Sequence, residues 1–456
     1  MGLKDILGSN MSYISFAKQH LTRIPYSFGK YIALVPYGIR PGMSTIYPLR
    51  KSEIANFNEF NSEKYKHFIF EKVKNISVYA YTHIEFYKKF YKASGVNPNQ
   101  FSHFNNLFEL PIISKAELQA VSIEERSNMK LKKSIANTGG SSGQPLSFYI
   151  EPSSIPHEWA HMHTIWAKLG YKQSDLKIVF GGRADVKNIM EYDAVRHQLT
   201  LDIYKSPQQI ADTLLANFKK YKPKYLHGYP SAIFDFVIWL DVNKHPLLAI
   251  LKQYIQGMFL GSEFPSPVHR KKVEELLSCG SVSWYGHTER AVLAYEKDEQ
   301  YTYNPFVSYG FSEAIKNQQD DFSLVATSYY NYASPLIRYD TSDLIDPNIQ
   351  DGLLVDFKIS SGRNGEYILD RHSNKIYLTA LIFGRHHSIF DYVQHIQVKQ
   401  NEVGKAIFYI TSSENYSHEY LIDKMDLSNV DLDFSFEVIQ SPIKTAAAKV
   451  PLLIRS

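Results

Sequence analysis

The chain has a single cysteine, Cys279, among its 456 residues. One cysteine excludes an intramolecular disulfide and any zinc site built from several cysteines. The neighbouring residues Leu276, Leu277 and Val282 are apolar, and no base can be assigned to the thiol. We therefore interpret Cys279 as a buried structural group and not as a nucleophile.

Long hydrophobic runs and a strong charge bias are also missing. No stretch of about 18 apolar residues occurs, which argues against a transmembrane helix. Residues 1–18 lack the apolar centre of a signal peptide, so we expect a cytoplasmic protein. The formal net charge is only +4, with 50 Lys and Arg against 46 Asp and Glu. Nucleic-acid binding, which needs a clustered basic face, is not expected.

Apolar and aromatic residues are abundant, at 44% and 14% of the chain. This composition supports a large core, and the length exceeds the size at which one core keeps growing, so two domains are expected. The first 61 residues are aromatic and punctuated by proline. Their apolar segment 32–37 has two interpretations that stay open: packing on the main domain, or contact with a partner.

Strand-like and helix-like segments alternate along the chain. Strands are expected at 177–182, 225–228, 254–260 and 281–285, and helices at 63–93, 155–169, 207–221 and 267–277. This alternation predicts an α/β fold with a largely parallel sheet whose ligands bind at the carboxyl ends of strands. The composition becomes polar near 360–365, so we predict a large domain at 1–361 and a small α+β domain at 362–456.

A loop of three glycines and three hydroxyl residues lies between two apolar segments: Thr138, Gly139, Gly140, Ser141, Ser142 and Gly143. Glycine lets backbone N–H groups point to one centre and the hydroxyls add donors, so a phosphate is the natural ligand. The alternative is a solvated Gly/Ser turn. No lysine follows the last glycine, so this is not a Walker A loop.

The glycine loop and four further segments, in the same order, resemble the signatures of the adenylate-forming enzymes, the superfamily of acyl-CoA synthetases and peptide-synthetase adenylation domains. Segment 284–289 is similar to its Tyr-Gly-x-Thr-Glu motif and segment 335–343 to its Arg-Tyr-x-Thr-Gly-Asp motif. Segment 361–363 resembles the hinge between its domains, and Lys449 stands where its C-terminal catalytic lysine is found.

Within that superfamily, the chain most resembles phenylacetate-CoA ligase and the CapK-type proteins of capsule and surface-polysaccharide biosynthesis. The segments that carry this resemblance are 110–115, 228–232, 261–263 and 444–449. The resemblance covers nearly all of the chain after about residue 63. It implies a large adenylate-forming domain followed by a small lid domain, with ATP and Mg²⁺ as cofactors.

The resemblance also implies roles for individual residues. The loop 138–143 would hold the β and γ phosphates, Thr288 would donate to the α phosphate, and Glu289 would coordinate Mg²⁺. Tyr285 would stack on adenine, and Asp343 would accept hydrogen bonds from the ribose. The remaining nucleotide-binding residues are Gly261, Ser262 and Glu263 at the adenine edge, Gly286 and His287 within the motif, and Arg363 at the hinge.

Catalysis and acyl binding are assigned in the same way. Lys449 on the lid would neutralise charge as the acyl-adenylate forms, with Thr288 and Glu289 as its catalytic partners. The expected acyl pocket is formed by Trp159, His163, Phe180, Gly228 and Tyr229. These residues suggest an aromatic or hydrophobic acid, although the apolar stripe containing Trp159 is also typical of a helix that faces the core.

Four positions depart from the family pattern. Ser342 replaces the usual glycine before Asp343, and Ala448 replaces the glycine before Lys449. Gly365 stands at the hinge where an acidic residue or lysine is usual, and Asn374 replaces a glycine after the hinge strand. The changes near the lid bear on the transfer step.

The resemblance leaves three functions open. The protein could activate a carboxylic acid for surface-polysaccharide (capsule or O-antigen) biosynthesis, transferring it to an amine of a sugar nucleotide or amino acid. It could instead be an acyl-CoA ligase of the phenylacetate-CoA ligase type, with coenzyme A as the acceptor thiol. The third hypothesis is a catalytically inactive scaffold with the same fold. The sequence leaves the oligomeric state open.

Overall fold

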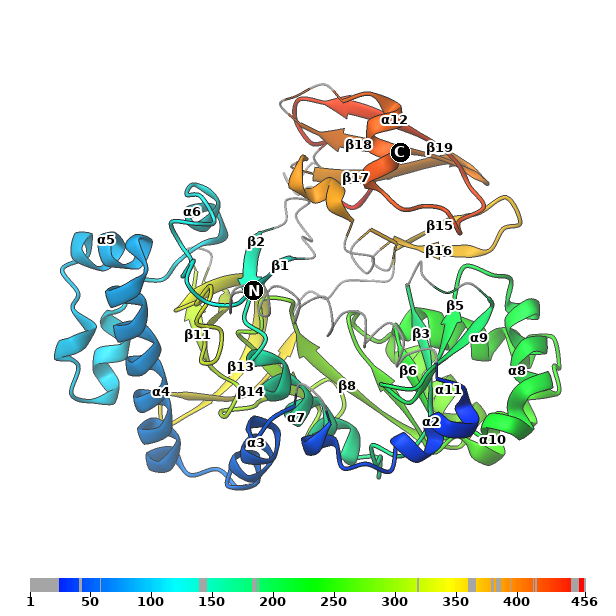
Figure 1. The fold of residues 1–456 in the computed structure, drawn as a ribbon, viewed down its shortest axis with the longest axis horizontal. Helices are drawn as coiled ribbons and strands as arrows, with labels where there is room; N and C mark the ends of the chain where they lie inside the picture. The colour runs from blue at the N-terminus through cyan, green and yellow to red at the C-terminus, as the bar shows by residue number, and fades with distance from the viewer. Residues whose placement is uncertain are drawn as a thin grey trace, which may run out of the picture.

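The structure, a computed structural model, describes most of the chain. The described residues are 24–40, 43–57, 59–138, 146–182, 186, 188–317, 320–359, 366–378, 381–382, 387–393, 395–412, 414, 416–443 and 451–454. Figure 1 shows helices and sheets in the lower part of the view and the C-terminal strands above them.

The helices within these ranges are α2 (Tyr26–Ile32), η1 (Tyr37–Ile39), α3 (Ile46–Ala55), α4 (Ser62–His83), α5 (Glu85–Ala93), η2 (Pro98–Gln100), η3 (Phe104–Glu109), α6 (Lys115–Gln119), α7 (Ser154–Ala167), α8 (Pro207–Tyr221), α9 (Pro230–Val242), α10 (Leu247–Tyr254), α11 (Pro267–Leu277), η5 (Ser388–Asp391) and α12 (His418–Lys424).

The strands are β1 (Ser134–Asn137), β2 (Ser147–Ile150), β3 (Lys177–Gly181), β4 (Met190–Asp193), β5 (Gln198–Asp202), β6 (Tyr225–Gly228), β7 (Gly257–Leu260), β8 (Gly280–Gly286), β9 (Leu293–Tyr295), β10 (Asn304–Pro305), β11 (Gly310–Lys316), β12 (Phe322–Ser328), β13 (Tyr339–Gln350), β14 (Leu353–Ile359), β15 (Tyr367–Leu369), β16 (Lys375–Tyr377), β17 (His395–Glu402), β18 (Lys405–Thr411), β19 (Asp433–Ile439) and β20 (Leu453–Ile454).

The largest sheet has the order β10-β9-β8-β7-β6-β3-β5-β4, and its five central strands from β8 to β5 are parallel. Side chains alternate between its two faces, as a pleated strand requires. On one face Leu226 and Met258 pack with α8, α9, α10 and α11, whereas on the other Tyr225 and Phe259 pack with α7. Trp166 of α7 stacks on Phe259 with ring centroids 5.1 Å apart. The predicted α/β fold with a mostly parallel sheet is confirmed.

Local sequence signals set several helix boundaries. α8 begins where Ser206 caps the helix and Pro207 occupies its first turn, and the side chains of Ser206 and Gln209 cap each other's backbone N–H groups. α11 has the predicted bounds. The single helix expected at 63–93 is wrong, because Ile84 is extended, with φ of −126°, and separates α4 from α5. This break lets buried Ile84 and Tyr87 face the same core as α4.

A second sheet, antiparallel β11-β12-β13-β14, follows the large one. Arg338, directly before β13, lies in the left-handed region, with φ of 46°. Its guanidinium binds both carboxylate oxygens of buried Glu313 at 3.1 and 2.9 Å and donates to the backbone oxygens of Phe108 and Leu110. Arg338 therefore fixes the segment that leads into α6.

The C-terminal part contains the hairpin β15-β16 and the four-stranded sheet β19-β18-β17-β20. The small α+β unit was expected from residue 362, but that boundary lies outside the described residues. The division at 361 and 362 therefore stays a prediction. Among the helices described, none is long and apolar enough to cross a bilayer.

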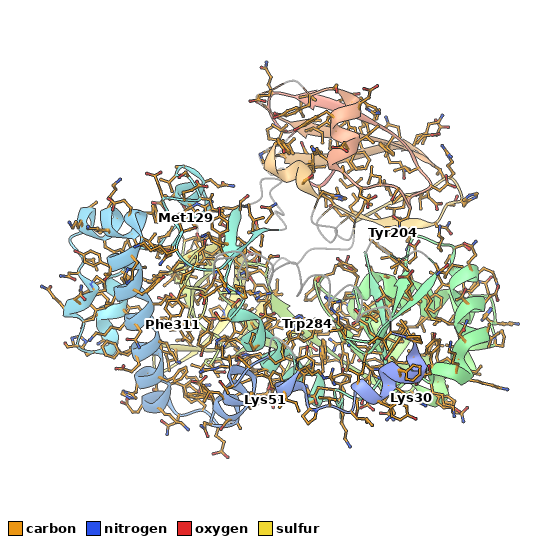
Figure 2. All side chains as sticks on the ribbon, in the orientation of Figure 1. Lys30, Lys51, Met129, Tyr204, Trp284 and Phe311 are labelled. Carbon is orange, nitrogen blue, oxygen red and sulfur yellow. The ribbon has the colours of Figure 1, made fainter. Side chains whose placement is uncertain are left out.

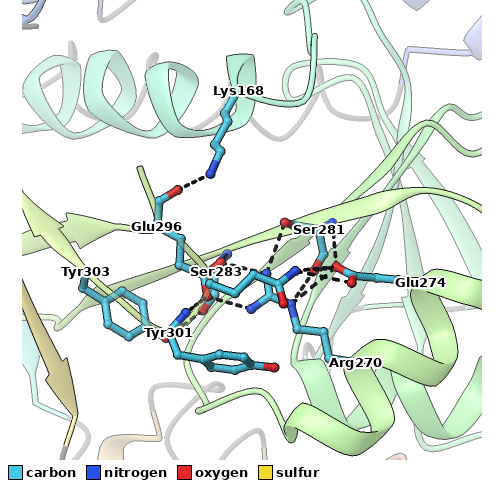
Figure 3. Close-up of polar contacts among 9 residues, drawn as sticks. Lys168, Arg270, Glu274, Ser281, Ser283, Glu296, Tyr301 and Tyr303 are labelled. Atoms are coloured by element: carbon cyan, nitrogen blue, oxygen red, sulfur yellow. Dashed lines mark hydrogen bonds and ion pairs between the residues drawn. The ribbon is translucent and has the colours of Figure 1, made fainter. Parts of the chain in front are cut away.

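A buried ion pair joins α11 to the large sheet (Figure 3). Arg270 binds the carboxylate oxygens of Glu296 at 2.6 and 2.7 Å, and both side chains are almost fully buried. Glu296 also accepts from the backbone N–H groups of Ser283 and Tyr301, and Arg270 donates to Ser281. All of the charge in this network is compensated within the protein.

Replacing Arg270 by methionine should destabilise the protein by about 3–5 kcal/mol, because it leaves the Glu296 carboxylate buried without a cation. The urea midpoint of unfolding measures the effect. The double variant Arg270→Met/Glu296→Gln should recover part of the loss. Lys272→Met on the same helix removes only a half-exposed ion pair with Asp241 and should cost less than about 1 kcal/mol. If Arg270→Met and Lys272→Met lowered the free energy of unfolding equally, burial of the Arg270–Glu296 pair would not determine how much the pair contributes to stability.

Candidate functional site

The motif after β8 meets the motif in β13 through a direct hydrogen bond. The hydroxyl of Tyr285 donates to Oδ2 of Asp343 at 2.5 Å. Burial, together with the nearby Asp343 carboxylate, raises the pKa of Tyr285, so its phenol keeps the proton and acts as donor. Ser342 has φ of 61°, which explains why glycine is usual there and predicts backbone strain in this chain.

His287 and Glu289 form a close charge pair in the same motif. Nδ1 of His287 lies 3.2 Å from Oε2 of Glu289, but at an angle that does not make a regular hydrogen bond. Burial by itself lowers the pKa of His287, but the Glu289 carboxylate more than offsets this and raises it. Burial likewise raises the pKa of Glu289, and the imidazole reverses the shift, so the carboxylate is held ionised.

Two further groups face Glu289. Burial and the Glu289 carboxylate raise the pKa of Tyr339, and the charge of Lys115 helps to lower the pKa of the Glu289 carboxylate. Lys115 is brought there by Ile113, which pairs with Tyr339 in a parallel bridge and exchanges backbone hydrogen bonds with residues on either side of it. In the sequence, segment 110–115 pointed only to the family branch, so this contact was not predicted.

The side of α7 that approaches the motif is polar. Nη1 of Arg290 donates to Oγ of Ser154 at 3.1 Å, and its Nε lies 3.9 Å from Oε2 of Glu158. The hydroxyl of Tyr309 also donates to Glu158. Arg290 directly follows Glu289 and has φ of 55°, so the backbone turns sharply there and carries the guanidinium to α7. No sequence signal pointed to Glu158, because the apolar stripe dominated the interpretation of this helix.

The five residues assigned to the acyl pocket fall into two groups. Trp159 and His163 face the N-terminal segment: the Tyr37 ring lies 5.9 Å from the Trp159 ring, and Nδ1 of His163 lies 2.8 Å from the hydroxyl of Tyr47.

The other three residues, Phe180, Gly228 and Tyr229, lie together at the ends of β3 and β6. Phe180 is opposite Gly228 in the sheet and packs on Phe236 of α9, with ring centroids 5.4 Å apart. The backbone N–H of Tyr229 donates to the oxygen of Phe180. Because Phe180 belongs to the α9 face and Trp159 contacts the N-terminal segment, the structure does not bring the five together.

The turn Gly261–Ser262–Glu263 lies beside the end of β8. A side chain at Gly261 would collide with the Trp284 ring, at 2.3 Å, so glycine is required there. Figure 2 shows Trp284 near the middle of the lower part of the molecule. Oε2 of buried Glu263 accepts from Oγ of Ser231 at 2.5 Å, while its Oε1 has no hydrogen-bond partner among the described residues. Burial raises the pKa of Glu263.

The hairpin β15-β16 is attached next to this turn. Nζ of Lys375 lies 2.6 Å from Oδ2 of Asp235, and the hydroxyl of Tyr377 donates to the same carboxylate and lies 3.2 Å from the oxygen of Ser231. Ser231 therefore links the hairpin to Glu263. The left-handed residue of the hairpin turn is Ser373, with φ of 62°, and not Asn374, which replaces the family's glycine. Asn374 instead donates to Asp370.

Thr138 closes the base of the glycine loop. Its N–H donates to the oxygen of Leu146 at 3.0 Å, and its Oγ1 accepts from the N–H of Leu146 at 2.9 Å. Nine further residues named in the sequence analysis lie outside the described part of the chain: Gly139, Gly140, Ser141, Ser142, Gly143, Arg363, Gly365, Ala448 and Lys449.

These donors and acceptors fit a nucleotide with magnesium. Gly286, His287, Thr288 and Glu289 lie together at the end of β8, beside the Tyr285–Asp343 pair. Within the described ranges no group of three or more His, Cys, Asp or Glu side chains could hold a metal. A single carboxylate suits Mg²⁺, which takes one or two carboxylates and completes its shell with phosphate oxygens and water. The unpartnered Glu263 Oε1 offers a buried acceptor at the predicted adenine edge.

The His287–Glu289 pair should make stability depend on pH. The contribution of His287 is complete below its ordinary pKa of 6.5 and is lost as pH rises through the raised value in the folded protein. That of Glu289 is complete above 4.5 and is lost in acid. The melting temperature of His287→Asn should therefore fall furthest below that of the natural protein near pH 6, and the gap should narrow at alkaline pH. His372→Asn, at an exposed histidine, is the control. A gap independent of pH would contradict the pairing.

The Asp235 contacts should control how firmly the hairpin is attached. Asp235→Asn removes the charge that Lys375 binds, so hydrogen exchange at 367–377 should become about two- to fivefold faster, as expected for a partly exposed ion pair. Mass spectrometry of deuterated peptides measures this. Asp241→Asn, on the same helix but paired with Lys272, should leave the hairpin unchanged. Equal exchange in Asp235→Asn and the natural protein would show that these contacts do not hold the hairpin.

Comparison with known proteins agrees with this geometry. No protein-family model matches the chain. Protein CapK of Staphylococcus aureus is 23% identical over 390 residues, which cover 80% of this chain and 83% of CapK.

Among solved structures, 2-hydroxyisobutyryl-CoA ligase bound to 2-HIB-AMP and CoA in the thioesterification state superposes with a TM-score of 0.54 at 14% identity, over 86% of this chain and 90% of the ligase. The same ligase in the postadenylation state with R3-HIB-AMP gives a TM-score of 0.50 at 13% identity, over 85% and 89%. The resemblance expected from the motifs is confirmed: the chain has the fold of the adenylate-forming ligases, and its similarity to Protein CapK supports the CapK-like branch.

Proposed function

We propose that the protein activates a carboxylic acid with ATP and then transfers the acyl group to a nucleophile. The observation that supports this most directly is the convergence of Tyr285, His287 and Glu289 with Asp343, from two separate sheets. The sequence supports the same proposal, because five motifs occur in the order in which they occur in the adenylate-forming enzymes. The fold agrees with it, since 2-hydroxyisobutyryl-CoA ligase, which has this fold, has been solved with 2-HIB-AMP and CoA.

In the first step, an oxygen of the carboxylate attacks the α phosphorus of ATP, and the bond to pyrophosphate breaks. Both reactants are anions, so the site must supply positive charge and hydrogen-bond donors. Magnesium, when bound, offsets phosphate charge. Among the protein's own groups, Glu289, whose pKa is lowered, would hold the metal, Thr288 adds a hydroxyl, and the Glu289 carboxylate raises the pKa of His287, which favours the cationic imidazole beside the phosphates.

The nucleotide's other parts are assigned to the flanking residues. Asp343, already oriented by Tyr285, accepts the ribose hydroxyls through its free lone pairs. Glu263 Oε1 accepts from the adenine amino group. Residues 139–143 hold the phosphates, Arg363 bridges hinge and nucleotide, and Lys449 completes the charge balance from the C-terminal part; these three assignments rest on the motifs.

The polar side of α7 narrows the class of acid. Ser154, Glu158 and Arg290 lie next to the Thr288–Glu289 motif, whereas the Trp159 stripe faces the N-terminal segment. These side chains already pair with one another and with Tyr309, and a carboxylic acid that carries hydroxyl, amino or further charged groups could add hydrogen bonds to them, whereas a purely aromatic acid could not. We therefore favour a hydrophilic acid over the aromatic acid suggested by composition.

The acceptor and the cellular role are proposed from similarity to other proteins. Similarity to Protein CapK favours a role in surface-polysaccharide biosynthesis, in the cytoplasm, where ATP is supplied. The amine of a sugar nucleotide or amino acid would then attack the carbonyl carbon of the acyl-adenylate and form an amide, and the bond to AMP would break, releasing AMP and a proton. The second candidate is thioester formation with coenzyme A, the ligand bound by 2-hydroxyisobutyryl-CoA ligase.

Exchange of labelled pyrophosphate into ATP tests the first step. With a panel of hydrophilic and aromatic acids, exchange should occur with at least one acid and favour the hydrophilic ones. Glu289→Gln should lower the rate by about 100-fold or more, because it removes the charge that holds the metal. Glu275→Gln, an exposed acidic residue on α11, should leave the rate unchanged.

The remaining outcomes separate the alternatives. Full exchange in Glu289→Gln would remove Glu289 from the metal site. ATP binding with no exchange for any acid would favour the inactive scaffold. Once an acid is found, adding either coenzyme A or a panel of amines identifies the acceptor by its acylated product.

A further inference from the structure

The N-terminal helix α2 and the turns after it expose a row of large apolar side chains. Phe28, Tyr31 and Leu34 are spaced so that they share one side of the helix and its last turn, and Val35 and Ile39 extend the row into η1. Their exposed fractions are Phe28 67%, Tyr31 62%, Leu34 67%, Val35 40% and Ile39 74%. We call these five residues the α2 patch.

The opposite side of α2 is fixed to the body of the protein. Gly29 lies so close to Tyr192 of β4 that a side chain at this position would lie 2.5 Å from its hydroxyl. Ala33 is buried, and the guanidinium of Arg40 donates to the backbone oxygens of Ala33 and Val35. Segment 32–37 therefore packs inward through Ala33 while Leu34 and Val35 are held outward. The exposed side chains of the α2 patch therefore stand on a segment whose backbone is held in place by these contacts.

Lysines lie on α2 and at the end of α8 that contacts it. The hydroxyl of Tyr26 donates to the oxygen of Tyr221, the last residue of α8, at 3.2 Å, and their rings lie 4.8 Å apart. That end of α8 carries the exposed lysines Lys219, Lys220 and Lys222, and Lys30 is exposed on α2 itself. Figure 2 shows Lys30 at the lower edge of the molecule.

Acidic residues are absent from the two sequence segments that carry the α2 patch and its lysines. Between Asp5 and Glu53 there is no Asp or Glu, while Lys and Arg occur at six positions: Lys18, Arg23, Lys30, Arg40, Arg50 and Lys51. Residues 213–224 of α8 and the following turn also contain lysines and no acid. The sequence segments that carry the α2 patch and its lysines therefore have a net positive charge.

We propose that the α2 patch and its lysines dock the protein on an anionic phospholipid bilayer. Side chains of this kind enter the boundary between headgroups and acyl chains, and lysines within a few ångströms of the surface bind anionic headgroups. The ordered backbone avoids the entropic cost of folding a disordered anchor at the membrane. This surface is separate from the candidate site and does not depend on the proposed function.

Sedimentation of the full-length protein with vesicles tests the proposal. The protein should bind phosphatidylcholine vesicles containing phosphatidylglycerol, bind pure phosphatidylcholine much less, and dissociate as salt is added. The triple variant Phe28→Ser/Leu34→Ser/Ile39→Ser should lower the partition coefficient by about tenfold or more. Lys219→Glu, Lys220→Glu and Lys222→Glu should each lower it by about fivefold, and only for the anionic vesicles.

A matched control removes three exposed apolar side chains elsewhere: Val242→Ser/Val268→Ser/Ile349→Ser. It should bind vesicles as the natural protein does, and both triple variants should keep the natural circular dichroism spectrum and melting temperature. Equal binding by the α2 variant, equal loss in the control, or no difference between the two vesicle types would overturn the proposal. The proposal would also be overturned if the natural protein did not bind vesicles but formed oligomers, and the α2 triple variant were monomeric. In that case the α2 patch would bind a second copy of the chain.

Discussion

The parallel register of β6, β7 and β8 is the constraint on which the candidate site depends. Parallel neighbours end at the same edge of a sheet, so the turns that follow them are forced side by side. Leu260 is paired with Ser283, which puts Gly261 against Trp284 and the Tyr285 motif next to Glu263. Residues about 20 to 60 positions apart in sequence therefore share one edge. The second sheet then supplies Asp343, which the phenol of Tyr285 binds directly.

Three of the buried charge pairs among the described residues differ in a way that separates structural from functional roles. Arg270–Glu296 and Arg338–Glu313 are bidentate pairs whose remaining groups also bind backbone atoms, so little capacity is left for a ligand. His287–Glu289 is incomplete: neither ring nitrogen of His287 has a regular hydrogen bond among the described residues. Incompletely satisfied charge is expensive in a buried position, and proteins retain it where a ligand completes it.

Sequence reasoning succeeded where the signal was local or was a motif with fixed spelling. The bounds of α8 and α11 follow from residues adjacent in the chain, and the motifs assigned Tyr285 and Asp343 to different parts of one nucleotide, although the hydrogen bond between them was not predicted. It failed where tertiary contacts decide. The break at Ile84 serves packing between two helices, and which side of α7 approaches the Glu289 motif depends on the N-terminal segment that covers the other side.

The N-terminal segment packs against α7 and exposes part of its own apolar surface. By covering Trp159 and His163 with Tyr37 and Tyr47, it assigns the apolar stripe of α7 to the core and leaves the polar side for the motif. The apolar residues of this segment that do not pack on the protein are exposed to solvent in the α2 patch. Figure 1 shows α2 at the bottom of the view and the C-terminal sheet at the top, with the β15-β16 hairpin between that sheet and α9. A bilayer bound at α2 would therefore leave the hairpin contacts at Asp235 free to break and re-form, which any movement of the C-terminal part requires.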